Sequence, residues 1–202
     1  TGYDDTIAAL DAEGVQSFGY DRIAYLDVKG VKVALIGSYF PEDSAENTKE
    51  MTDNIAAARA EDAQLVIVYV HWGQEHEYDI TEGQQTAGRA AIDAGADLVV
   101  GSHPHVVQGW EVYQGRYIVY SLGNFCFGGN TNPDDKDCLI FQQTFTVTGD
   151  TVAKNDDVDF IAASVSTETD RNTYQPMLAE GDEKARIEAK VQEAADRIAA
   201  AA

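Results

Sequence analysis

The stretch DLVVGSHPHVVQG, residues 97–109, places an apolar strand directly before two histidines that are separated by one proline. Earlier in the chain, the apolar run LVIVYV at 65–70 is followed immediately by His71. A segment with helix-favouring composition precedes each run, over 45–63 and 81–95. Helices that alternate with short apolar strands at this spacing predict neighbouring parallel strands in an α/β sheet.

The other expected elements fall on both sides of this unit. Before it, we expect a helix over 1–13 and a hairpin made of strands 22–28 and 31–39. Beyond the two histidines the pattern becomes typical of antiparallel strands, with a hairpin turn at Gln114–Gly115 and further strands within 138–166. The expected fold is therefore a parallel sheet extended by antiparallel hairpins.

The end of the chain has a different pattern. Residues 181–202 predict one amphipathic helix, with Ile187, Val191 and Ile198 along its apolar stripe. No repeat, linker or domain boundary interrupts the sequence, so we expect residues 1–202 to form one domain portion that ends in this helix.

Charge and composition limit the possible partners and locations. The formal net charge of −21 argues against nucleic-acid binding, because phosphate contacts need clustered Lys and Arg. It fits an extracellular or cell-surface protein, although most of these carboxylates also fit a plain solvated surface. The longest apolar run is far shorter than the about 20 residues that span a bilayer, so we expect no transmembrane segment. The chain opens on Thr1 without a signal-like segment, and we interpret it as a piece of a longer protein.

The two cysteines, Cys126 and Cys138, lie on either side of a polar loop. Outside the cytosol such a pair is typical of a disulfide, whereas inside it the same residues stay free thiols. We expect a Cys126–Cys138 disulfide in the oxidised protein.

Three of the four histidines follow predicted parallel strands. In open α/β sheets the carboxyl ends of the strands form the edge where ligands bind. Pro104 disfavours the helical region for His103, and in extended chain His103 and His105 face the same side, about 6–7 Å apart. Histidines placed this way indicate a metal site, with packed or surface histidines as the alternative. His76 lies in a polar loop, and we expect it to point to solvent.

The same residues carry a family resemblance. The blocks HWGQE at 71–75, GADLVVGSHPHVVQGWEVYQGRYIVYSLGNF at 95–125 and FGGN at 127–130 resemble the bacterial capsule synthesis protein CapA family, also called PGA_cap. That family is similar to the calcineurin-like metallophosphoesterases. The resemblance implies the C-terminal half of an α/β/β/α sandwich around a two-metal centre, with the N-terminal half and its ligands absent from this chain.

The resemblance also implies roles for individual residues. It makes His71, His103 and His105 ligands of divalent ions of the Mn, Zn or Fe type, in a site that this chain leaves incomplete. His105 and Glu75 are the candidate catalytic residues. Glu75 could be a metal ligand, a general acid or base, or a surface carboxylate.

Three further residues have expected positions near this site. Asn124, in SLGNF, is expected to fix a loop by hydrogen bonds and to line the pocket. Trp72 either stacks on a ligand or packs beneath the metal loop. Glu111 is expected to form a structural salt bridge.

Two functions follow. The first is a metal-dependent hydrolase acting on a phosphoester or on an amide of a cell-surface polymer, and the second is a non-catalytic accessory protein of capsule synthesis or export. The expected partners are the capsule polymer or its synthesis machinery, together with the N-terminal half of the same protein. The expected location is the cell surface, with the full-length protein anchored to the membrane. A polyanion such as poly-γ-glutamate would be repelled unless metal ions or a basic patch, with Arg89 and Arg116 as candidates, offset the charge.

Overall fold

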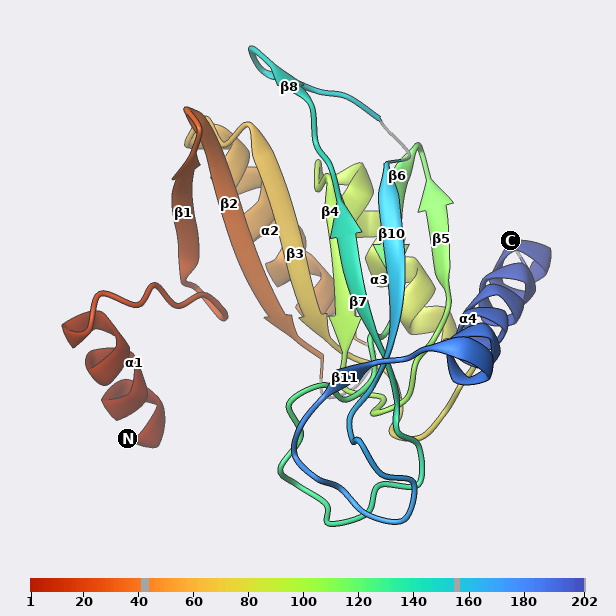
Figure 1. Ribbon diagram of the computed structural model, residues 1–202. Helices are drawn as coiled ribbons and strands as arrows, with labels where there is room; N and C mark the ends of the chain where they lie inside the picture. The colour runs from red at the N-terminus through yellow and green to blue at the C-terminus, as the bar shows by residue number, and fades with distance from the viewer. Residues whose placement is uncertain (41–43, 155–156, 202) are drawn as a thin grey trace.

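A computed structural model describes residues 1–40, 44–154 and 157–201 (Figure 1). Six strands of its largest sheet are Ile23–Val28 (β1), Val31–Tyr39 (β2), Leu65–His71 (β3), Leu98–Ser102 (β4), Trp110–Tyr113 (β5) and Arg116–Val119 (β6). Their order is β1-β2-β3-β4-β6-β5. The four central strands run parallel, and β1 and β5 pair antiparallel at the edges. The α/β prediction with parallel neighbours is confirmed.

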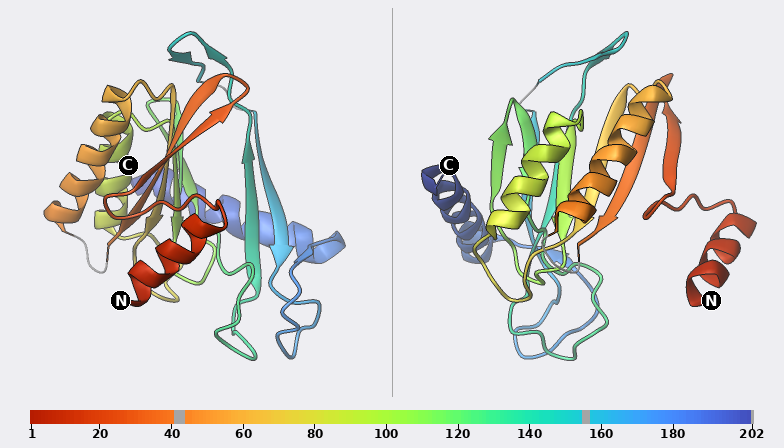
Figure 2. Two further views of the ribbon diagram at one scale, coloured as in Figure 1. Left: turned by 90° about the vertical axis from the view of Figure 1, so that its left-hand side faces the viewer. Right: turned by 180° about the vertical axis from the view of Figure 1, so that it is seen from behind.

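The remaining elements add layers on both faces of this sheet. They are the helices Gly2–Ala12 (α1), Ala45–Ala60 (α2), Glu82–Asp93 (α3) and Gly181–Ala201 (α4), and the strands Asp137–Gln143 (β7), Val147–Thr148 (β8), Thr151–Val152 (β9), Val158–Ser164 (β10) and Met177–Leu178 (β11). Helices α2 and α3 cover one face, and the antiparallel sheet β11-β10-β7 lies against the other (Figure 2). Helix α4 packs beside β5 and β10, whereas α1 lies apart and buries none of its residues.

The expected antiparallel strands and the terminal helix are thus present, except that positions 155, 156 and 202 lie outside the described residues. Ile187, Val191 and Ile198 are buried along α4, as the apolar stripe predicts. Within the described ranges, no helix is both long enough and apolar enough to cross a membrane.

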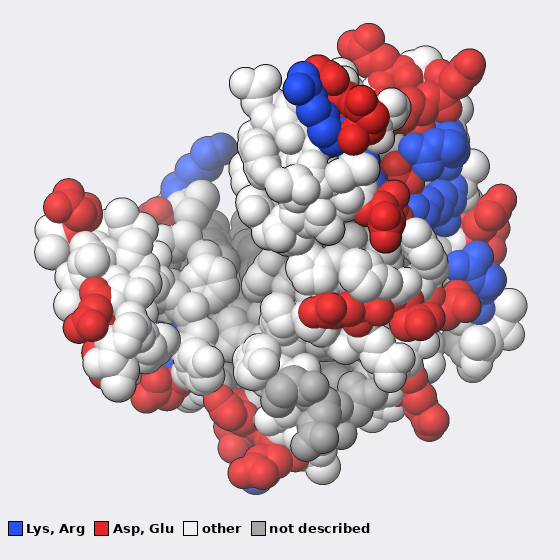
Figure 3. Space-filling model, turned by 90° about the horizontal axis from the view of Figure 1, so that it is seen from below, with Lys and Arg blue, Asp and Glu red and all other residues white. Residues whose placement is uncertain are grey.

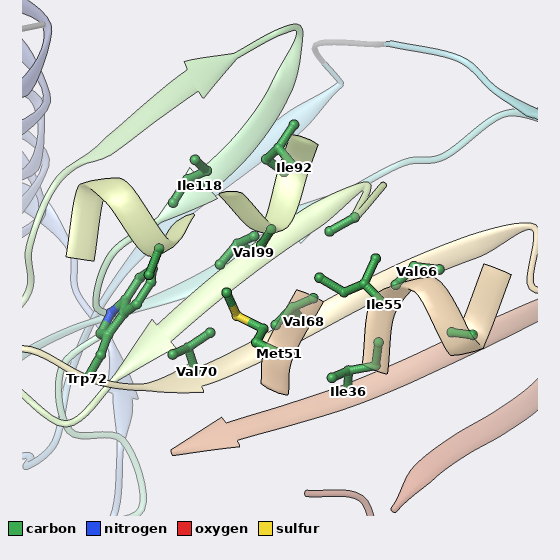
Figure 4. Packing of buried hydrophobic residues seen from close by; sticks show 14 of the residues in the cluster. Ile36, Met51, Ile55, Val66, Val68, Val70, Trp72, Ile92, Val99 and Ile118 are labelled. Carbon is green, nitrogen blue, oxygen red and sulfur yellow. The ribbon is translucent and has the colours of Figure 1, made fainter. Parts of the chain in front are cut away.

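The main core lies between the parallel sheet and its two covering helices. Val66, Val68 and Val70 of β3 are fully buried and point toward Met51 and Ile55 of α2 (Figure 4). Side chains alternate along a strand, so this set fixes which face each residue of β3 occupies. His71, the next residue, therefore turns to the face away from these helices.

A buried charge cluster ties the amino ends of the parallel strands together. Asp97 is 2% exposed, and its carboxylate contacts Arg59 at 2.7 Å and Arg116 at 3.1 Å. It also accepts a hydrogen bond from the backbone N–H of Val66. Arg59 donates further hydrogen bonds to backbone carbonyls, including that of Gly95. The buried Asp97 carboxylate is therefore paired with two guanidinium groups, at the end of the sheet opposite His71.

A second network joins α3 to the sheet edge. Arg89 binds both carboxylate oxygens of Glu111, with distances of 3.1 and 2.7 Å, and the Tyr120 hydroxyl donates to the same carboxylate at 2.6 Å. Burial and the neighbouring Glu111 carboxylate raise the pKa of Tyr120 far above its ordinary value. The expected structural salt bridge of Glu111 is confirmed. Arg89 and Arg116, the candidates for a basic patch, are each paired with a buried carboxylate, Glu111 and Asp97 respectively.

We predict that Asp97→Ala lowers the free energy of unfolding by about 3 kcal/mol, because it leaves two guanidinium groups and one N–H without their shared acceptor. The matched control is Asp53→Ala, which removes an exposed carboxylate paired with Lys49 one helical turn away. That change is expected to cost about 0.5 kcal/mol or less. Urea denaturation measures both values, and equal losses in the two variants would contradict the structural role of Asp97.

Candidate metal centre

The parallel pairing of β3 and β4 brings the histidines together. His71, the last residue of β3, pairs in register with Ser102, the last residue of β4. His103 follows at once, and its ring centroid lies 4.3 Å from that of His71. The ring of His105 lies 6.0 Å from that of His103. The prediction that these three side chains converge at one edge of the sheet is confirmed.

The backbone that achieves this differs from the expected extended chain. His103 has φ +101°, His105 has φ +61° and His76 has φ +63°. Such conformations cost about 1–3 kcal/mol each in residues other than glycine. Pro104 does keep His103 out of a helix, but the two imidazoles converge through left-handed backbone rather than through the alternation of a strand. A hydrogen bond between two loops helps to hold this backbone in place, since the N–H of His76 donates to the Pro104 carbonyl at 2.7 Å.

His105 is held by Asn124 on the following loop. The Asn124 side-chain N–H donates to the His105 carbonyl at 3.2 Å, which turns the amide oxygen toward the ring. That oxygen lies 2.7 Å from Nδ1 of His105. Because the oxygen can only accept, the neutral form of the ring carries its proton on Nδ1 and its lone pair on Nε2. The expected loop-fixing role of Asn124 is thus present in the structure, and it leaves Nε2 of His105 available as a metal ligand.

Glu75 approaches the same nitrogen. Its Oε1 lies 4.0 Å from Nε2 of His105, and the side chain is 58% exposed. Possible ligand atoms of Glu75, His103 and His105 all lie within 4.8 Å of one another. The ring of His71 lies next to that of His103, but His71 is not one of these three residues. Two imidazoles and one carboxylate suit ions of the Zn, Fe or Mn type, and three protein ligands leave positions open for water or substrate.

The surroundings of His71 favour its neutral form. Partial burial lowers its pKa below the ordinary value of 6.5, and the neighbouring His103 and His105 lower it further, while Glu75 acts in the opposite direction. A metal ligand has to be the neutral imidazole. His71 therefore offers a lone pair at neutral pH.

Two other sequence expectations need correction. His76 is exposed to solvent, as expected, but it is not separate from the other histidines, because its ring lies 6.1 Å from that of His105 at an interplanar angle of 28°. Trp72 does not line a pocket: it is fully buried, it stacks on Tyr120 and its Nε1 donates to the Tyr120 carbonyl at 2.8 Å. The second alternative for Trp72, packing beneath the histidine loop, is the correct one. A Cβ at Gly101 would lie 2.3 Å from Trp72 Nε1, so this packing requires glycine there.

The expected disulfide is not formed in this structure. Cys126 is an exposed free thiol, and Cys138 is a buried one. Burial raises the pKa of the Cys138 thiol to about 12, with smaller contributions from Asp137 and Asp135. Only the thiolate attacks another sulfur readily, so the environment of Cys138 opposes oxidation.

Two aromatic residues next to the histidines had no role in the sequence analysis. Tyr39 ends β2 in register with His71, and the two rings lie 5.2 Å apart. Phe127 places its ring 5.3 Å from that of His105. The strand pattern could have located Tyr39, because adjacent parallel strands end at the same edge. Phe127 belongs to an irregular loop, and no local pattern indicates its position.

We predict that the imidazole of His71 titrates below pH 6.5 in the metal-free chain, because burial and two neighbouring imidazoles disfavour its charged form. In His103→Ala its pKa should rise toward the ordinary value, since one of the repelling charges is gone. NMR titration of the histidine ring protons measures both. A pKa of His71 at or above 6.5 in the unmodified chain would contradict the described environment.

Comparisons with known proteins agree with the sequence resemblance. The sequence model of the family described as bacterial capsule synthesis protein PGA_cap matches residues 1–129. The PGA biosynthesis protein CapA of Bacillus subtilis (strain 168) is 39% identical over 117 residues, which are 52% of this chain and 31% of that protein. The capsule biosynthesis protein CapA of Bacillus anthracis is 35% identical over 150 residues, 62% of this chain and 36% of that protein.

A more distant relative is a probable polyglutamine synthesis accessory protein of Mycobacterium tuberculosis (strain ATCC 25618 / H37Rv), 28% identical over 152 residues, with 61% of this chain and 40% of that protein covered. The chain thus spans 31% to 40% of the length of these relatives. The family match covers well over half of the chain and includes every histidine of the candidate metal centre. The chain therefore belongs to the bacterial capsule synthesis protein PGA_cap family.

Proposed function

We propose that this chain carries the histidine part of a two-metal hydrolase site in a capsule synthesis protein of the cell surface. The observation that carries the proposal is the grouping of Glu75, His103 and His105 within 4.8 Å, next to the ring of His71. The family, and the capsule and PGA biosynthesis named in its relatives, support poly-γ-glutamate capsule synthesis as the setting.

Each residue has a distinct part in this proposal. His71, His103 and His105 hold divalent ions of the Mn, Zn or Fe type through neutral imidazole nitrogens. When bound, such ions would lower the pKa of a water molecule to about 7 and would stabilise the negative charge that develops on a phosphoester or amide. Glu75 is exposed enough to meet substrate, and it either completes the ligand set or moves a proton between water and leaving group. Asn124 keeps His105 in the tautomer that binds metal through Nε2.

The residues of this chain are too few for two ions. Three neutral imidazoles and one carboxylate do not balance two dications, and hard ions such as Mg²⁺ prefer oxygen ligands. The further ligands are proposed to come from other parts of the full-length protein. On this view the 202-residue chain binds one transition metal ion weakly and has no hydrolase activity by itself.

A second candidate function is a non-catalytic accessory role in polymer synthesis or export. The word accessory in the name of the Mycobacterium tuberculosis relative favours it. Acidic side chains are spread over the lower face of the molecule, and most of the Lys and Arg visible there lie on one side among them (Figure 3). A chain of net charge −21 would hold an anionic polymer only through bound metal or through another part of the protein.

We predict that the chain binds Co²⁺ in a 1:1 complex and that His103→Ala weakens binding at least tenfold, because it removes one of three ligands and leaves the others without their partner. Titration followed by the visible absorption of Co²⁺ measures the affinity. His76→Ala is the matched control, since His76 is outside the ligand group, and its affinity should stay within about twofold of the unmodified chain. Equal loss in both variants would place the ion elsewhere in the histidine cluster.

We predict that hydrolysis of an aryl phosphate with added Mn²⁺ or Zn²⁺ requires the longer protein and is abolished there by His103→Ala. The 202-residue chain alone should show no histidine-dependent turnover, because it lacks ligands for the second ion. Turnover by the chain alone that is lost in His103→Ala would show that the ligand set is already complete. No turnover by either protein, together with retained metal binding, would favour the accessory function.

A further inference from the structure

Two loops meet beside the candidate metal centre. The first, residues 124–136, forms most of the connection from β6 to β7, and the second, residues 165–176, connects β10 to β11 (Figure 1). Most side chains of both loops reach solvent, but Asn172 of the second loop is only 5% exposed. A buried amide in an exposed loop has to find hydrogen-bond partners within the protein.

Asn172 finds them in the first loop. Its side-chain N–H groups donate to the carbonyls of Phe127 at 2.8 Å and Asn130 at 3.0 Å. Its backbone N–H donates to the carbonyl of Thr131 at 2.7 Å. Its side-chain oxygen accepts from the N–H of Tyr174 at 2.8 Å, which fixes the orientation of the amide. One residue thus holds three carbonyls that lie more than 40 positions away in the sequence.

The first loop is also the loop that contacts His105. Asn124 holds the His105 ring at Nδ1, and Phe127 lies against it at a centroid distance of 5.3 Å and an interplanar angle of 50°. The Phe127 carbonyl is itself one of the acceptors of Asn172. The buried amide therefore binds the backbone of the residue whose ring lies beside the His105 imidazole.

We propose that Asn172 is a positioning residue of the candidate metal centre: it fixes the Phe127 ring against His105 and so fixes the direction of the Nε2 lone pair. The metal part of this inference rests on the proposed function. The first loop has no regular secondary structure at Phe127. The conformation of this loop therefore depends on the few hydrogen bonds that it forms with the second loop. Asparagine suits the task because its amide has two donors in one plane and an acceptor beside them.

Residues that orient a ligand from outside typically change metal affinity by about 10- to 100-fold when they are removed. Asn172 acts through Phe127, so we expect the lower end of this range, about tenfold weaker Co²⁺ binding in Asn172→Ala. The matched control is Asn132→Ala. Asn132 is an exposed asparagine of the first loop whose side chain accepts a hydrogen bond from Lys136, and its removal should leave the affinity within about twofold.

The first measurement uses the metal-free 202-residue chain. NMR should show a nuclear Overhauser effect between the rings of Phe127 and His105 in the unmodified chain and in Asn132→Ala, but not in Asn172→Ala. Asn172→Ser keeps one donor on a shorter side chain, and the same ring contact is measured in this variant if the alanine variant does not fold. A folded Asn172 variant that retains the ring contact would overturn the proposal, because Asn172 would then only stabilise the loop.

The second measurement is the Co²⁺ titration of the same variants. Loss of the ring contact together with about tenfold weaker binding is the expected result, and loss of the contact with unchanged affinity would overturn the positioning role. If the unmodified chain binds no Co²⁺, the proposed function fails and the metal role of Asn172 fails with it. The ring contact still decides separately whether Asn172 positions His105.

Discussion

The in-register parallel pairing of β3 with β4 is the constraint on which the candidate site depends. It sets His71 opposite Ser102, so that both strands end at the same edge of the sheet and the three histidines meet there. The register is in turn fixed by the core, since Val66, Val68 and Val70 fill the space under α2. A slip by one residue would turn these valines to the opposite face and His71 into the helix layer. The hydrophobic core therefore determines where His71 lies at the edge of the sheet.

Stability and site geometry are divided between the two ends of the sheet. The amino ends hold the buried cluster of Arg59, Asp97 and Arg116, in which every charge is paired. The carboxyl ends hold left-handed backbone at His103 and His105, which costs stability and is typical of functional sites. At the carboxyl ends, Trp72 is buried in the core and directly follows His71. The candidate site therefore lies at the edge of the central sheet and is completed by the loops that follow its strands.

Much of this arrangement follows from the sequence alone. Alternating apolar runs and helical segments predict the parallel sheet, and the position of His71 and His103 after two such runs predicts their convergence. The sequence could not show that the backbone at His103 is left-handed, because Pro104 excludes the helix without selecting one alternative. Nor could it show that His76 lies near His105, because the hydrogen bond from His76 to Pro104 joins two loops that are far apart in the sequence. Asn172 is the extreme case, since its partners lie more than 40 residues away in an irregular loop.

Metal binding between the histidines at the carboxyl ends of β3 and β4 is the proposal on which the function rests. X-ray absorption spectroscopy of the chain loaded with one equivalent of Zn²⁺ tests it most directly. The expected spectrum has a first shell of nitrogen and oxygen only, at about 2.0–2.1 Å, with outer-shell scattering from at least two imidazole rings. A sulfur shell at about 2.3 Å would instead assign the ion to Cys126, and a shell of water oxygens without imidazole scattering would show that the histidine cluster does not bind metal.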